Sequence, residues 1–168
     1  MTPIRRVLLL WLFMFWQGGF LFYGAVVVTI GSTVLESDFA QGLITRYVAV
    51  ALNITGGVVL LAWTWDLISE RHSRLTLRWS AWTMLLASVI ALACIHPNMD
   101  ALIDAHRKTL HDADRFHHLH RWYLRISTAQ WLTSVVFTWW TVQNWRESDS
   151  EAGSEPRAKA GEGNEKSG

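Results

Sequence analysis

The sequence predicts an all-α integral membrane protein whose four spanning helices pack as one bundle. Four long apolar stretches alternate with polar segments, and the charged residues gather in those segments rather than being scattered along the chain. Most of the eleven tryptophans fall near the span ends on the side that holds the N-terminus. Tryptophan favours the interface between membrane and water, so its placement supports the number of spans.

The first apolar stretch, residues 7–30, contains no charged side chain and directly follows Arg5 and Arg6. A helix rises about 1.5 Å per residue, so about 20 apolar residues cross the hydrocarbon core. The stretch is longer than the roughly 7–15 apolar residues of a signal peptide, and we interpret it as a retained span. Its strongly polar side chain, Gln17, is expected to face the other helices.

The second predicted span covers residues 43–67 and carries a polar face. Arg46, Asn53 and Gly57 are spaced i, i+7 and i+11, so they share one side of the helix. A charge that faces lipid costs at least ~2.5–3.5 kcal/mol at the membrane centre. This face is therefore expected to point inward, although Arg46 lies near enough to the edge to reach the interface.

The third predicted span covers residues 79–95. His96-Pro97 is expected to end it, because proline disfavours helical geometry in the residue before it. Apolar residues then recur at helical spacing from Met99 to Ala113, with charged residues between them. This pattern predicts an amphipathic helix in the third loop.

The fourth predicted span covers residues 122–145, with Arg125 one turn inside it. Its serines, threonines and glutamine make it the most polar of the four, so it is expected to pack against the other helices. Residues 1–146 form the membrane domain. Residues 147–168 contain no aromatic or branched aliphatic residue and are predicted to be a disordered tail.

Four spans put both termini on one side of the membrane. The two sides carry equal numbers of basic residues, and the N-terminal pair Arg5-Arg6 decides in favour of cytoplasmic termini. The expected location is a bacterial inner membrane. A net charge of +1 gives no electrostatic reason to expect nucleic acid as a partner.

Histidines gather around the third loop. His96 ends the third span, and His117, His118 and His120 lie at the start of the fourth. Imidazole is the commonest metal ligand, so these four residues could hold a transition metal, or a haem between two spans. The simpler interpretation is a solvated polar helix with local ion pairs and no cofactor.

A second candidate site consists of Gln17, Arg46, Asn53 and Arg125, since polar residues inside a membrane are functional candidates by default. They could line a path for a substrate or an anion. Pairing of the arginines with the acidic first loop or with lipid headgroups explains them equally well. No nucleophile motif or phosphate-binding loop supports an enzyme, and no catalytic residue is assigned.

The layout resembles the transmembrane-protein-205-like family. The residues that carry the resemblance are Gln17-Gly18-Gly19-Phe20 in the first span, Leu52-Asn53-Ile54-Thr55-Gly56 in the second, and Leu119-His120-Arg121 before the fourth. It covers about residues 8–144. The resemblance implies a small four-helix membrane protein and no established activity.

The sequence thus favours a multi-pass, non-enzymatic membrane protein that interacts with or supports other membrane proteins. Its expected partners are the lipid bilayer and further membrane proteins, including copies of itself. Two alternatives stay open: a metal- or haem-binding protein that uses the histidines, and a small-molecule or ion carrier that acts as an oligomer.

Overall fold

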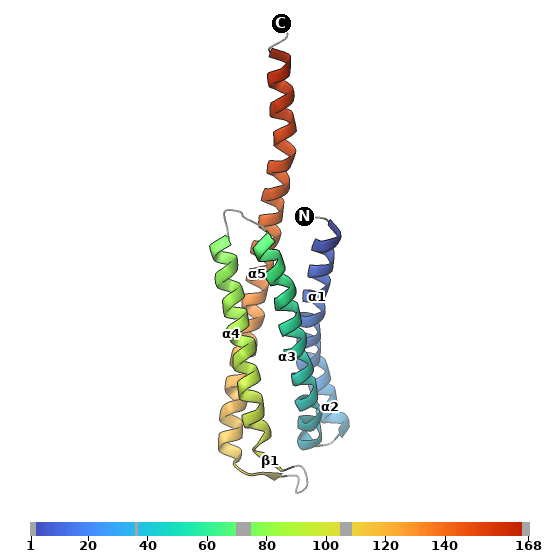
Figure 1. The fold of residues 1–168 in the computed structure, drawn as a ribbon. Helices are drawn as coiled ribbons and strands as arrows, with labels where there is room; N and C mark the ends of the chain where they lie inside the picture. The colour runs from blue at the N-terminus through green and yellow to red at the C-terminus, as the bar shows by residue number, and fades with distance from the viewer. Residues whose placement is uncertain (1–2, 36, 70–74, 105–108, 166–168) are drawn as a thin grey trace.

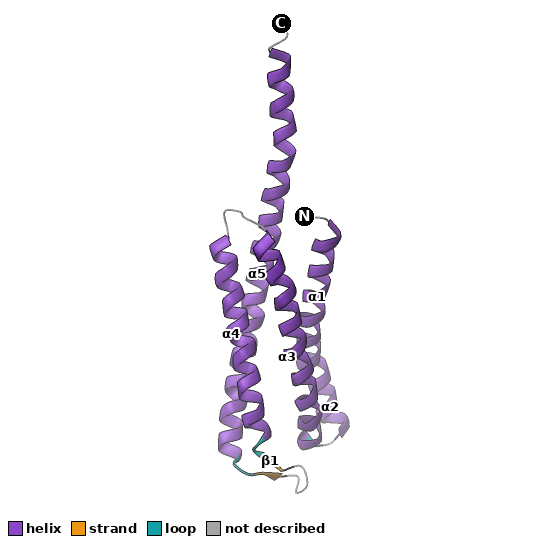
Figure 2. Cartoon of the chain, in the orientation of Figure 1, coloured by secondary structure: helices purple, strands orange, loops and turns teal. Residues whose placement is uncertain are grey.

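The chain is almost entirely helical (Figure 1). The computed structural model describes residues 3–35, 37–69, 75–104 and 109–165. Within these ranges, four long helical segments lie side by side, and a short β-hairpin joins the last two (Figure 2). We call the end that holds the first turn of α1 the N-terminal end, and the opposite end the hairpin end.

The first helical segment runs without a break from Pro3 to Leu35. It consists of α1 (Pro3–Phe22), the π-helical turn η1 (Tyr23–Val27) and α2 (Val28–Leu35). The predicted first span, residues 7–30, lies within it. Single π-helical turns inside α-helices are rare and are found frequently at functional sites.

The second and third long helices are α3 (Asp38–Ser69) and α4 (Leu75–Asp100), and both extend beyond the predicted spans. The predicted stop at His96-Pro97 is wrong, because α4 continues through Pro97. Proline removes one backbone donor from this last turn. The Asn98 side chain donates to the Cys94 carbonyl at 2.7 Å, and the turn closes normally beyond the proline.

The predicted amphipathic helix in the third loop is also wrong. The chain instead forms β1 (Ile103–Asp104) and β2 (Thr109–Leu110), which pair antiparallel. A continuous helix could not reverse the chain between two antiparallel neighbours, whereas a hairpin does. Residues 105–108 of this loop lie outside the described residues.

The last helix, α5 (Ala113–Glu165), contains the whole predicted fourth span. The Asp112 carboxylate caps it by accepting a hydrogen bond from the Arg115 N–H at 2.9 Å. α5 then continues through most of the tail that was predicted to be disordered, and extends away from the other helices (Figure 1). An existing helix propagates easily, and the alanines and glutamates of this tail favour helix, whereas its Pro156 and the three glycines within α5 oppose it. Residues 166–168 of the tail lie outside the described residues.

An aromatic core joins the helices. The most extensive contact is between α4 and α5, followed by α3 with α4 and α1 with α3. Trp63 of α3 is fully buried; its ring lies 5.1 Å from that of Phe137 and stacks on Trp145 at 5.9 Å. Trp16 of α1 packs directly on Gly56 of α3, where an added Cβ would lie 2.6 Å from the indole ring. Gly56 therefore sets the spacing between α1 and α3.

Three helices of the described chain are long and apolar enough to cross a membrane: Pro3–Leu35, Phe39–Ser69 and Leu75–Asp100. Their apolar side chains are largely on the outside. On α1, for example, Trp11 and Phe15 are 71% and 72% exposed. The predicted fourth span on α5 does not meet the same criterion, because its serine, threonine, glutamine and tryptophan residues lower its mean hydropathy.

Candidate functional site

α5 buries mostly polar side chains and leaves many of its large apolar side chains exposed. Gln130 and Asn144 are 4% and 1% exposed, whereas Leu132 and Val135 are 54% and 51% exposed. The buried polar residues of this helix are Ser127, Gln130, Ser134, Thr141 and Asn144. An amphipathic helix on a water-soluble protein shows the opposite arrangement.

Several buried polar atoms in this interior have no hydrogen-bond partner among the described residues. They include Gln130 Oε1, Thr141 Oγ1, Trp63 Nε1 and Trp145 Nε1. Leaving such a group unpaired costs about 1–3 kcal/mol, so buried polar groups are normally satisfied.

At the N-terminal end, a buried ion pair joins α3 to α4. Arg78 Nη2 donates to Asp66 Oδ2 at 2.6 Å, and the two side chains are 1% and 0% exposed. Arg5 of α1 lies 3.8 Å from the second Asp66 oxygen and donates to the Ser69 hydroxyl at 3.2 Å. The Asp66 carboxylate thus connects three helices.

A second ion pair joins α1 to α5 at the same end. Arg6 donates to both carboxylate oxygens of Asp149, at 2.7 and 3.0 Å. Its guanidinium also lies 5.3 Å from the ring centre of Trp145, which belongs to the aromatic core. The hydrogen bonds from Arg6 lower the pKa of the Asp149 carboxyl.

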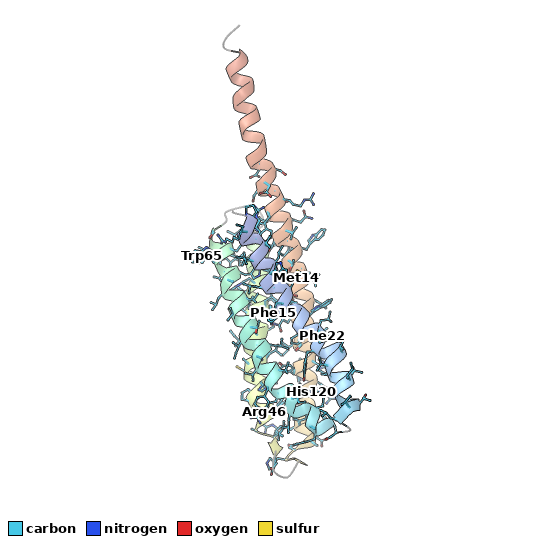
Figure 3. The ribbon with its side chains drawn as sticks, turned by 90° about the vertical axis from the view of Figure 1, so that its right-hand side faces the viewer. Met14, Phe15, Phe22, Arg46, Trp65 and His120 are labelled. Atoms are coloured by element: carbon cyan, nitrogen blue, oxygen red, sulfur yellow. The ribbon has the colours of Figure 1, made fainter. Side chains whose placement is uncertain are left out.

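At the hairpin end, Arg46, His96 and Asp100 form a cluster between α3 and α4. Arg46 Nε lies 3.0 Å from Asp100 Oδ2, and His96 Nδ1 lies 3.4 Å from the same oxygen. His96 Nε2 is 3.0 Å from the Arg46 carbonyl oxygen. Both ring nitrogens of His96 therefore face protein oxygens, and a metal ion would have to displace one of them. Figure 3 shows Arg46 and His120 toward this end and Trp65 at the other.

The π-helical turn positions a tyrosine against α3. The Tyr23 hydroxyl donates to Thr45 Oγ1 at 3.0 Å and lies 3.4 Å from Gln41 Nε2. Gln41 is 5% exposed and also covers Gly31 of α2, where a Cβ would overlap the Gln41 amide. This small network fixes the start of α3 against the first helical segment.

The other predicted metal ligands lie together on the first turns of α5. His117 and His118 are exposed and His120 is half-buried. The His120 ring stacks on Phe116, and burial together with the nearby His117 lowers its pKa. Among the described residues, no three histidine, cysteine or acidic side chains lie close enough together to hold a metal ion.

The remaining predicted polar residues are distributed over three helices. Gln17 is half-buried on α1. Asn53 of α3 faces Tyr123 of α5 across the interior. Arg125 is exposed on α5, with its guanidinium 5.3 Å from the ring centre of Trp122. The structure thus brings Arg46 to His96, but it shows no joint cluster of all the predicted residues.

Sequence reasoning missed the Asp66–Arg78 pair. Asp66 is the one acidic residue within the predicted second span, and that signal was available in the sequence. An acid inside a span requires a partner, and Arg78 follows on the next helix after a short connection. Asp100 and Tyr23 were missed as well, because nothing in their local sequence indicates their contacts.

Comparisons with known proteins add no further assignment. No protein family matches this chain. No curated protein and no solved structure shows a significant similarity to it.

Proposed function

We propose that this chain is a four-span integral membrane protein in which α5 provides the fourth span. One observation carries the proposal: most of the side chains that α5 buries are polar, whereas large apolar side chains of the same helix are exposed. In water, this arrangement would leave much of the apolar surface of α5 in contact with solvent. In a bilayer, exposed apolar side chains are solvated by lipid, and buried serine, threonine and glutamine side chains join helices.

The low mean hydropathy of α5 agrees with this proposal. Several of the polar residues that lower it, including Gln130, Ser134 and Asn144, are buried in the protein interior. The outward face of α5 carries the exposed apolar side chains of Leu132, Val135, Val136, Trp139 and Val142. All four helices would then form one antiparallel bundle.

The proposed orientation has both termini in the cytoplasm of a bacterial cell and the hairpin end on the other side of its inner membrane. Arg5 and Arg6 at the N-terminal end support it, because cytoplasmic flanks carry an excess of basic residues. The resemblance to the transmembrane-protein-205-like family is kept as part of this proposal.

The proposed role is that of a non-enzymatic protein that interacts with or supports other membrane proteins. The ion pairs that join α1, α3, α4 and α5 at the N-terminal end favour a fixed bundle over one that opens and closes. The exposed aromatic residues of α1 offer a surface to lipid or to another membrane helix. They include Phe15 and Phe22 (Figure 3) and also Trp11.

Cysteine labelling tests this proposal. Cys94 is the single cysteine, so Cys94→Ser gives a background free of thiols. Ser150→Cys at the N-terminal end and Ala113→Cys at the hairpin end then report the two sides, because both positions are exposed. In intact cells, an impermeant maleimide should label position 113 and not position 150, and the protein should resist extraction with carbonate.

Labelling of both positions from one side would contradict four spans. Labelling of position 150 alone would reverse the orientation. Release by carbonate would rule out an integral membrane protein.

A specific observation favours a carrier as the second candidate function: Gln130 Oε1 and Thr141 Oγ1 are buried without a partner in the described chain. If a polar solute crosses this interior, Gln130→Leu together with Thr141→Val should abolish its flux into liposomes. Flux that is absent for the wild type, or unchanged in the variant, would exclude this path.

An absorption spectrum with metal analysis of the purified protein tests the alternative that His96, His117, His118 and His120 hold a haem or a metal.

A further inference from the structure

A shallow hollow of about 220 Å³ lies on the outer face of α5, near the hairpin end. It is lined by His118, Arg121, Trp122 and Arg125. These residues are spaced i, i+3, i+4 and i+7, so one stripe of a single helix provides the whole lining. His118 and Arg125 were named above in two different candidate sites, but none of those sites combines the four residues of this hollow.

The side chains of the hollow are fixed by each other. Trp122 Nε1 donates a hydrogen bond to His118 Nε2 at 3.1 Å. Indole is only a donor, so His118 Nε2 must be the accepting nitrogen, and in the neutral ring Nδ1 carries the proton. The Arg125 guanidinium lies over the Trp122 ring at 5.3 Å. The hollow therefore presents N–H donors from two guanidinium groups and an imidazole.

The two arginines carry positive charge that no described carboxylate neutralises. Within the described part of the chain, neither Arg121 nor Arg125 forms an ion pair with a carboxylate. This differs from Arg5, Arg6 and Arg46, each of which faces an aspartate. An anion from outside the chain is the natural complement to such a pair.

The stripe continues directly onto an apolar surface. His118, Arg125, Leu132 and Trp139 follow one another at intervals of seven residues and share one face of α5. Leu132 and Trp139 are 54% and 62% exposed. A free phosphate ion would use only the charged part of this face. A phospholipid would use both parts, with its phosphate in the hollow and an acyl chain along the apolar surface.

We propose that the hollow lined by His118, Arg121, Trp122 and Arg125 binds the headgroup phosphate of an anionic phospholipid, and that the exposed apolar face of α5 holds one of its acyl chains. The inference rests on the proposed membrane insertion, which places this turn of α5 at the level of the headgroups. It gives the protein a lipid ligand that the fold alone does not imply.

The experiment counts bound lipid by native mass spectrometry on the full-length protein, delipidated in detergent. Phosphatidylglycerol is compared with phosphatidylcholine as the titrated lipid. The wild type should bind one phosphatidylglycerol at least tenfold more tightly than phosphatidylcholine. Arg121→Gln together with Arg125→Gln should weaken phosphatidylglycerol binding about 25-fold, because each basic side chain beside the anionic headgroup contributes roughly a fivefold gain.

The matched control is Arg115→Gln together with Arg146→Gln. It removes the same charge from exposed positions of the same helix, outside the hollow, and should change binding less than twofold. Trp122→Leu removes the donor to His118 and the ring beneath Arg125, and should weaken binding several-fold while the charge stays constant. Both arginines are exposed, so the double variant should keep its helical circular dichroism.

Equal binding of phosphatidylglycerol by the wild type and the arginine double variant would overturn the proposal. So would equal loss in the control variant, because net charge alone would then explain the binding. Displacement of the lipid by an equal concentration of inorganic phosphate would show that the site takes a free anion instead. If wild-type protein resists carbonate extraction and yet shows no preference for phosphatidylglycerol, the lipid site fails while the membrane proposal stands.

Discussion

The two ends of the molecule carry similar side chains in opposite environments. At the N-terminal end, the Asp66 and Arg78 side chains are fully buried. At the hairpin end, Arg46 and Asp100 make the same kind of pair at 3.0 Å, but their side chains are 37% and 21% exposed. Removal of one partner from a buried ion pair strongly destabilises the fold, because the remaining charge is left without water. At an exposed pair, water and dissolved ions replace the lost partner.

This difference separates a stabilising role from a binding role. At the N-terminal end, charged side chains of different helices form ion pairs with one another, and these pairs hold the helices together. The hairpin end keeps arginines and histidines accessible, including His118, Arg121 and Arg125 of α5. Changes at the first end should therefore alter stability, and changes at the second should alter ligands and pH response more than stability.

The largest effect is expected for Arg78→Met. It leaves the buried Asp66 without its closest cation, and such a loss costs about 3–5 kcal/mol. Unfolding of the purified protein in detergent with increasing sodium dodecyl sulfate measures it. The double replacement Asp66→Leu with Arg78→Leu should recover most of the stability, because no buried charge is left over. A loss in Arg78→Met below 1 kcal/mol would mean that this end is hydrated.

The next largest effect is expected for Gly56→Ala, which tests how closely α1 and α3 pack. A methyl group at Gly56 would meet the Trp16 ring at 2.6 Å, whereas one at Gly57 would meet nothing within 4 Å. Overpacking of this kind costs typically 1–3 kcal/mol. Gly57→Ala is the neighbouring control and should be at least as stable as the wild type, because alanine favours the helix over glycine and meets no neighbour there. Equal stability of the two variants would show that α1 is free to move away from α3.

Asp100→Asn should have a smaller effect at the hairpin end. The pair with Arg46 is partly exposed, and such pairs contribute about 0–1 kcal/mol. The same unfolding measurement applies, and its comparison with Arg78→Met gives the contrast between the ends directly. A loss as large as that of Arg78→Met would remove the distinction.

The smallest effect is a pH response at His120. Its folded pKa is lowered below 6.5 by burial and by His117, so unfolding takes up a proton in acid. The stability of the wild type should therefore decrease as pH falls below 6.5, and His120→Asn should reduce this decrease. His111→Asn, at an exposed histidine, is the control. An identical pH dependence in wild type and His120→Asn would contradict the expected shift.

The sequence was sufficient to predict the helices, because long apolar stretches bounded by charges leave few alternatives. Residues 7–30, 43–67, 79–95 and 122–145 all fall inside helices of the structure. The errors fall on the connections. The pattern from Met99 to Ala113 fits a helix locally, but the antiparallel position of α4 and α5 requires the chain to turn back there.

The sites were less accessible to sequence reasoning than the fold. Arg46 and His96 were named as members of different sites, and the structure joins them through Asp100 and a backbone carbonyl. Such a contact depends on the register between two helices, which periodicity within each helix does not determine. Asp66 differs from these residues, because an acidic residue inside a predicted span can be recognised from the sequence alone as needing a partner.

The π-helical turn at Tyr23–Val27 changes the phase of the first helical segment. The turn accommodates one extra residue. The apolar and polar positions before and after the turn therefore follow helical repeats that are offset by one residue. Deletion of Gly24, where an added Cβ would meet no neighbour within 4 Å, would remove the extra residue, so the turn would close as ordinary α-helix and the residues beyond it would keep their orientation. Gly31 would then still pack against Gln41, and the α2–α3 contact would survive. A chain without the turn should therefore be one residue shorter here and keep the same contact between α2 and α3.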